Sequence, residues 1–179
     1  MPRQVKTEGF VLKKKSLPSK DNIITLFTKD FGKISVFAKG VKTITSKRLP
    51  HLQTGNLIIA TVSNTPDRRY LQETVLISAF SHIKKDSHKL SFMYLIFFVL
   101  DRLLPEEQKE ESQYSLLKRF IFTLADQKNT ADIAYLQATI QELLTSLGYL
   151  NETDHQMNIE ELKPVIEGLI NEKLPFFII

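Results

Sequence analysis

The sequence contains no cysteine and no tryptophan, and only six of its 179 residues are glycine. The absence of cysteine excludes disulfide bonds, thiolate zinc sites and cysteine nucleophiles, and it is compatible with a reducing compartment. We therefore expect a cytoplasmic protein that uses neither a metal ion nor another cofactor.

Long hydrophobic runs are also missing. The longest apolar stretch, Phe92 to Leu100, is far shorter than the ~20 residues needed to span a bilayer. The first nine residues, MPRQVKTEG, lack the apolar run of a signal peptide. The sequence therefore predicts no membrane partner and no export, and it favours a buried helix over residues 92–100.

Charge is distributed unevenly along the chain. Residues 1–89 carry 17 Lys and Arg against 6 Asp and Glu, whereas the remaining residues carry 7 against 14. The formal charges of the two parts are +11 and −7, so the net charge of +4 hides a strongly basic first half. A basic surface of this kind is typical of nucleic-acid binding, and the break near residue 80 favours two domains, 1–80 and 81–179.

Alternating apolar and polar residues predict five short strands in the first half. Their expected ranges are 6–14, 22–28, 33–39, 57–63 and 70–77. Five strands in about 75 residues suit a small barrel such as the OB-fold. In the third strand, Ile34, Val36 and Ala38 alternate with Lys33, Ser35, Phe37 and Lys39. The second set is expected to form an exposed face on which two cations flank an aromatic ring.

After Ser81 the apolar residues recur at spacings of three and four, which predicts three helices over 90–104, 114–124 and 133–147. Pro105 is expected to end the first helix, Asp132 or Thr130 to cap the third, and Gly148 to close it. Pro164 fits either the first turn of a last helix or a kink in a longer one. The predicted fold class is α+β, with an N-terminal five-stranded OB-fold barrel followed by an all-helical domain.

The basic half offers cations for phosphates and aromatic rings for bases. Phe37 and Tyr70 are the candidate stacking platforms, and the loop from Lys39 to Arg48 is expected to be a flexible basic arm. Lysines also occur on loops simply because water solvates them, but so many cations with so few acids exceed what solubility needs. The predicted DNA-binding residues are Lys13, Lys14, Lys15, Lys33, Phe37, Lys39, Lys42, Lys47, Arg48, Arg68 and Arg69.

Catalytic and metal-binding patterns are weak. His82 and Asp86 share a helix face, but two ligands do not close a metal site, and a surface helix start is the simpler interpretation. The acidic residues between Glu106 and Glu111 are expected to form a solvated helix start. There is no nucleophile motif and no Gly-x-x-x-x-Gly-Lys-Ser/Thr phosphate loop. We therefore expect a protein that is not an enzyme and does not use ATP.

Several residues in order resemble the amino-terminal domain of RecO, the bacterial recombination mediator. They are Val11-Leu12-Lys13-Lys14-Lys15, Asp21, Ile23, Thr25-Leu26-Phe27-Thr28, Gly32-Lys33-Ile34, Ala38-Lys39-Gly40 and Ser46, with Leu143-Leu144 and Leu147-Gly148-Tyr149 further on. The resemblance implies an OB-fold and a helical domain, binding of single- and double-stranded DNA, and annealing of complementary strands. It also implies RecR and single-stranded-DNA-binding protein as partners.

Two departures from the family pattern are visible. Pro18-Ser19 stands where many members have Gly-Glu before the second strand, and the four-cysteine zinc element that often follows Leu-Gly-Tyr is missing. The chain thus resembles a short, cysteine-free member. Three alternatives remain open: an OB-fold RNA-binding protein, an adaptor for an acidic protein partner, and a nuclease, which would need clustered carboxylates.

Overall fold

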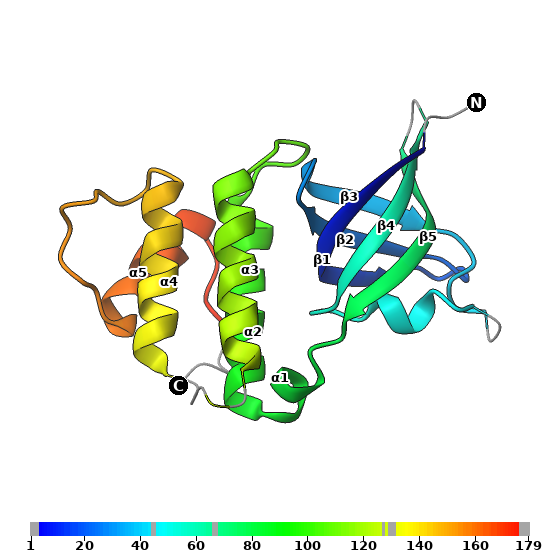
Figure 1. Ribbon diagram of the computed structural model, residues 1–179. Helices are drawn as coiled ribbons and strands as arrows, with labels where there is room; N and C mark the ends of the chain where they lie inside the picture. Colours follow the sequence, from blue (N-terminus) through cyan, green and yellow to red (C-terminus); the bar gives the residue numbers. More distant parts are fainter. Residues whose placement is uncertain (1–3, 44–45, 66–67, 127, 129–131, 176–179) are drawn as a thin grey trace. The chain divides into compact units, whose positions relative to one another are not determined.

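The computed structural model describes residues 4–43, 46–65, 68–126, 128 and 132–175 (Figure 1). The chain divides into two compact units. The first contains Met1–Phe80 together with Leu104–Glu111, and the second contains Ser81–Leu103 and Ser112–Ile179. The assignment of DNA binding to residues 1–80, with a helical domain over 81–179, stays a prediction.

The first unit is a closed five-stranded barrel with the strand order β1-β2-β3-β5-β4. Neighbouring strands are antiparallel except β3 and β5, which pair in parallel over two residues. This closed barrel of five short strands confirms the OB-fold prediction. The strands are β1 (Gln4–Ser16), β2 (Asn22–Thr28), β3 (Gly32–Ala38), β4 (Leu57–Asn64) and β5 (Arg69–Ser78).

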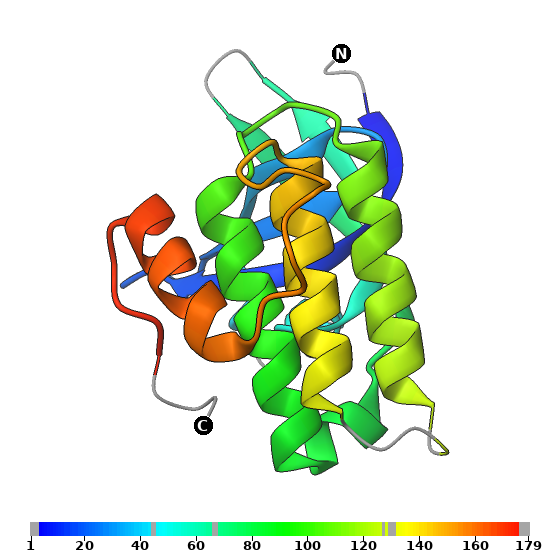
Figure 2. The ribbon, with the colours of Figure 1, turned by 90° about the vertical axis from the view of Figure 1, so that its left-hand side faces the viewer.

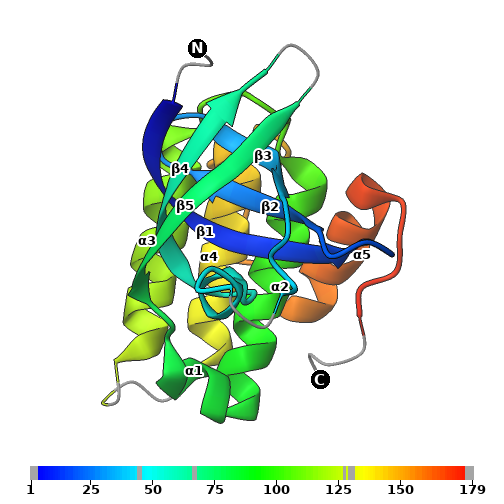
Figure 3. The ribbon, with the colours of Figure 1, turned by 90° about the vertical axis from the view of Figure 1, so that its right-hand side faces the viewer.

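The barrel interior is filled by the apolar residues of the alternating pattern. Ile34, Val36 and Ala38 of β3 are all buried, as their spacing predicts. Leu52 joins the same core from a short 3₁₀ helix, η1 (Leu49–Leu52), at one end of the barrel (Figure 3). Because side chains alternate along a strand, burying these residues turns their neighbours outward, and this sets up the functional face.

Residues 104–111, which we call the strap, run beside the start of β3. Lys33 and Glu106 form a parallel bridge, and the Glu107 N–H donates to the Lys33 carbonyl at 2.8 Å. Gly32, at φ 66°, allows the strap to approach, since a Cβ there would lie 1.7 Å from the Gln108 carbonyl oxygen. The prediction of a helix start over Glu106–Glu111 is therefore wrong for most of this run. The backbone pairs with β3, and the next helix begins only at Glu111.

In its described residues the second unit is helical, and α2, α3 and α4 run alongside one another (Figure 2). The helices are α1 (Ser81–Lys85), α2 (Ser87–Leu103), α3 (Glu111–Ala125), α4 (Ile133–Ser146) and α5 (Ile159–Ile170). The three predicted apolar stripes lie in α2, α3 and α4, and Phe92 to Leu100 is largely buried, as expected. The five-residue helix α1 contains His82 of the predicted surface helix start, but it ends before Asp86 and is too short to show an apolar period.

The helix ends follow the expected capping residues where the structure describes them. The Asp132 side chain caps α4 by accepting from the Ala134 N–H at 2.9 Å, while the alternative cap, Thr130, lies outside the described residues. Gly148 follows α4 at φ 79°, as a closing glycine should. Pro164 lies inside α5, which already begins at Ile159, so its predicted placement within a longer helix is confirmed and its placement in a first turn is wrong.

Candidate nucleic-acid interface

The strand register places four residues in one row across the outside of the barrel. Lys15 of β1 pairs with Ile23 of β2, Ile23 with Phe37 of β3, and Phe37 with Tyr70 of β5. Since alternate residues of a strand share a face, Lys13 lies on the same side as Lys15, two positions before it. We call the set Lys13, Lys15, Ile23, Phe37, Lys39, Arg68 and Tyr70 the outer row.

Cations and aromatic rings meet at the β3–β5 end of the outer row. The Phe37 and Tyr70 rings are arranged edge to face with centroids 5.7 Å apart. The Arg68 guanidinium lies 5.5 Å from the centroid of the Phe37 ring, within cation–π range. Both rings are half-buried, while Arg68 is exposed. This end of the row therefore offers a positive charge beside an aromatic surface, which suits a phosphate next to a base.

The loop after β3 is fastened to the barrel at both of its described ends. The Arg48 guanidinium donates to the Lys39 carbonyl at 2.6 Å and to the Leu71 carbonyl at 2.7 Å. The Lys42 ammonium donates to the carbonyls of Leu17 and Ser19. These acceptors are neutral, so the loop keeps its positive charge. Lys39 and Lys47 are exposed, and residues 44–45 of the predicted arm lie outside the described part of the chain.

Besides Lys42, Lys47 and Arg48 of the loop, three further predicted DNA-binding cations lie apart from the outer row. Lys14 is in register with the buried residues Ile24 and Val36, and its ammonium donates to the Gln53 side chain at 3.3 Å. Lys33 is on the same side of β3 as Phe37, but only 7% of it is exposed beside the strap. The expectation of an exposed Lys33 is thus wrong, because a segment distant in sequence pairs with its backbone.

Arg69 is the third of these cations. Its guanidinium lies 3.3 Å from a Glu107 carboxylate oxygen of the strap, and 6.0 Å from the centroid of the Phe31 ring. A phosphate would therefore compete with Glu107 for this side chain. Contact between these predicted residues and DNA stays a prediction.

Two residues of the β1–β2 loop join this surface, although the sequence did not single them out as contacts. Lys20 is exposed, and its carbonyl accepts the Lys42 N–H at 3.0 Å. Asp21 is bonded to the Gly40 N–H. Asp21 is one of the residues that carry the family resemblance and is a lone carboxylate inside a basic stretch, but neither signal reveals its hydrogen-bond partner.

Asp86 of the predicted histidine and carboxylate pair has a structural role. The Asp86 carboxylate accepts from the N–H groups of His88 and Lys89 and so caps α2. Among the residues that the structure describes, no group of three His, Asp or Glu side chains could hold a metal ion. In the same part of the chain, no helix has both the length and the apolar character needed to cross a bilayer.

Comparisons with known proteins find similarity to RecO proteins. Residues 1–80 match the family model described as "Recombination protein O N terminal". The chain is 29% identical over 153 residues to the "DNA repair protein RecO" of Thermoanaerobacter sp. (strain X514), covering 86% of this chain and 61% of the relative. It is 31% identical over 155 residues to the Clostridium acetobutylicum protein of the same name, covering 84% and 60%.

A third relative aligns over nearly the whole chain. The "DNA repair protein RecO" of Prosthecochloris aestuarii is 24% identical over 177 residues, which cover 97% of this chain and 67% of the relative. The chain thus spans about three fifths to two thirds of the length of these curated relatives.

Proposed function

Since the chain belongs to the RecO family, we propose that it binds single- and double-stranded DNA through the outer row and anneals complementary strands in DNA repair and recombination. OB-fold barrels bind oligonucleotides on the face of strands 2 and 3 and on the loops after strands 1 and 4. Here those parts carry Ile23, Phe37, Lys20 and Arg68. This coincidence of the basic, aromatic row with the usual binding face carries the proposal.

Annealing follows from charge neutralisation without covalent chemistry. Two strands repel each other through their phosphates, and cations on a shared surface lower that repulsion. A shallow row of lysines leaves the base edges open for pairing, while an aromatic ring can stack on an unpaired base. No step in this scheme consumes a nucleotide or needs a metal ion, so the proposed role is that of a mediator rather than an enzyme.

RecR and single-stranded-DNA-binding protein are the proposed partners. This proposal rests on family membership. The partners stay a proposal because the chain spans only part of the length of its relatives.

The interface is tested by removing equal charge from two places. The first variant changes Lys13, Lys15 and Lys39 to alanine, and the matched control changes Lys118, Lys128 and Lys163 of the helical unit. Each lowers the formal net charge from +4 to +1. We expect the outer-row variant to lower the slope of log affinity against log salt on duplex DNA by about 2.7, at ~0.9 per phosphate contact.

The control variant should keep the wild-type slope. Equal losses in both variants would show that binding follows net charge rather than this face. Lys42 and Arg48 are left unchanged because their side chains hold backbone carbonyls. Parallel titrations with RNA of the same sequence decide between the DNA-binding proposal and the RNA-binding alternative.

A further inference from the structure

Asp21 connects the β1–β2 loop to the loop after β3. One of its carboxylate oxygens accepts the Gly40 N–H at 2.7 Å, and the other accepts the Ser19 hydroxyl at 2.9 Å. Gly40 has φ 64°, so the chain turns sharply at the residue whose N–H Asp21 holds. The carboxylate thus fixes the turn between Lys39 and Lys42.

The two loops are joined at further points around the same carboxylate. The Lys42 N–H donates to the Lys20 carbonyl at 3.0 Å, and its ammonium donates to the Ser19 carbonyl at 3.0 Å. Three lysines, at positions 20, 39 and 42, are therefore gathered around Asp21.

The carboxylate is ionised at neutral pH. The Gly40 N–H holds the pKa of Asp21 below its ordinary value of 3.8, with help from the Ser19 hydroxyl and from the charges of Lys39 and Lys42, against a smaller opposing effect of burial. A negative charge beside three lysines should by itself repel a phosphate. Electrostatics alone therefore gives no reason for an acid at this position, whereas the hydrogen bond to Gly40 does.

We propose that Asp21 is a positioning residue for DNA binding. By holding the Gly40 N–H and the Ser19 hydroxyl, it keeps Lys20, Lys39 and Lys42 together at the edge of the outer row, where they can contact successive phosphates. This inference rests on the proposed DNA-binding function and assigns to an acidic residue a favourable effect on the binding of an anion.

The direction in which the affinity for DNA changes distinguishes a positioning role of Asp21 from an effect of its charge alone. Asp21→Ala removes both the charge and the acceptor, and we expect about tenfold weaker binding to duplex DNA, the loss typical of one charge-assisted contact. Asp21→Asn removes the charge but keeps an oxygen for the Gly40 N–H, so it should bind at least as tightly as wild type. If Asp21 acted only through its charge, both variants would bind more tightly.

Asp21→Glu provides a test that does not depend on how well the alanine variant folds. It keeps the charge but moves the carboxylate by one methylene, so weaker binding and a salt slope reduced by about 1 to 2 would support positioning. Unchanged affinity and slope in Asp21→Glu would overturn it. Thermal unfolding of each variant serves as the folding control.

The outer-row variant described above separates the two proposals. If removing Lys13, Lys15 and Lys39 leaves DNA binding intact, the proposed interface itself fails. If that variant loses binding while Asp21→Ala binds as well as wild type or better, only the positioning role fails.

Discussion

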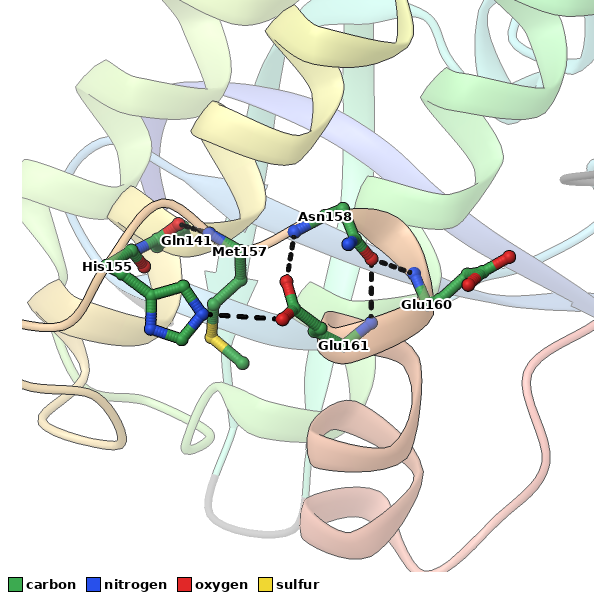
Figure 4. Close-up of polar contacts among 6 residues, drawn as sticks. All are labelled: Gln141, His155, Met157, Asn158, Glu160 and Glu161. Atoms are coloured by element: carbon green, nitrogen blue, oxygen red, sulfur yellow. Dashed lines mark hydrogen bonds and ion pairs between the residues drawn. The ribbon is translucent and has the colours of Figure 1, made fainter.

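At the scale of single residues, the start of α5 shows how a few side chains define a helix end. The Asn158 side-chain oxygen accepts the N–H groups of Glu160 at 2.9 Å and Glu161 at 3.1 Å (Figure 4). In return, the Glu161 carboxylate accepts the Asn158 N–H at 2.8 Å. This reciprocal pair is a capping box, and it satisfies N–H groups that lack a partner within the helix.

Replacing the cap should lower stability by a known amount. We expect Asn158→Ala to reduce the free energy of unfolding by about 1 kcal/mol, the usual cost of losing an N-cap side chain. The matched control is Asn151→Ala, because Asn151 is exposed and bonds to Asp154 through its backbone N–H, which alanine keeps. Urea unfolding measures both variants, and equal losses would contradict the assigned role of Asn158.

The Glu161 carboxylate predicts a pH dependence at the same helix end. The Asn158 N–H, and to a lesser extent His155 at 3.4 Å, hold the pKa of Glu161 below its ordinary value of 4.5. A pKa lowered by folding stabilises the protein above the unfolded-state value, and this stabilisation is lost as the pH falls through the folded-state value. Glu161→Gln should therefore be less stable than wild type at pH 7.

The difference between Glu161→Gln and wild type should shrink as the pH falls from the ordinary value of 4.5 through the lower pKa that Glu161 has in the folded protein. Urea unfolding at a series of pH values gives this difference directly. A gap that stays constant down to strongly acidic pH would show that the charge of Glu161 has no part in the stabilisation.

At the scale of elements, the strap and β3 depend on each other through Gly32. Gly32 and Gly148 both have positive φ, at 66° and 79°, so alanine at either position costs roughly 1 to 2 kcal/mol of backbone strain. Only at Gly32 would the added Cβ collide with backbone, the Gln108 carbonyl, while Gly148 has nothing within 4 Å. We expect Gly32→Ala to cost at least about 1 kcal/mol more than Gly148→Ala. Similar losses in urea unfolding would mean that the strap moves away without penalty.

The strap should also influence DNA binding through Arg69. Glu107→Gln removes the carboxylate that faces this guanidinium, so binding should tighten and the salt slope should rise by up to ~0.9. Glu111→Gln is the control, since it removes the same charge from a residue paired with Lys109. Folding should be little affected, because the Glu107 side chain is 62% exposed and an ion pair at the surface contributes ~0 to 1 kcal/mol. Equal changes in the two variants would remove Arg69 from the interface.

The sequence predicts those elements whose signal is local. The range of β2 and the buried set Ile34, Val36 and Ala38 follow from a period of two that each strand carries by itself. The strap has no such signal, because its pairing joins Lys33 to Glu106 across the rest of β3, two further strands and helices α1 and α2. For the same reason the sequence does not predict that Lys33 is buried, or that the carbonyls of residues 71 and 72 accept hydrogen bonds from Arg48.

At the scale of the whole molecule, the charge asymmetry and the barrel register support the same proposed function from separate observations. The charge asymmetry can be read from composition alone, but the register shows which cations share a surface. It places Lys13 and Lys15 on the same face of the barrel as Phe37 and separates Lys14 from them. Three consecutive lysines therefore have unequal roles in the proposed interface, a distinction that strand alternation explains.

Annealing should proceed at the same rate with and without ATP, since the proposed mechanism depends only on charge neutralisation. Complementary oligonucleotides labelled as a fluorescence pair report the rate, and the outer-row variant should be slower than the helical-unit control. A strict requirement for ATP in the purified system would contradict the mechanism.

The strap also fixes the order in which the molecule can be completed during synthesis. All five strands have been made once Ser78 is joined, yet the first unit still lacks Leu104–Glu111, which follow α1 and α2 in the chain. A nascent barrel must therefore wait for a later segment before Lys33 is covered. A fragment cut at residue 80 likewise represents this unfinished stage of the first unit.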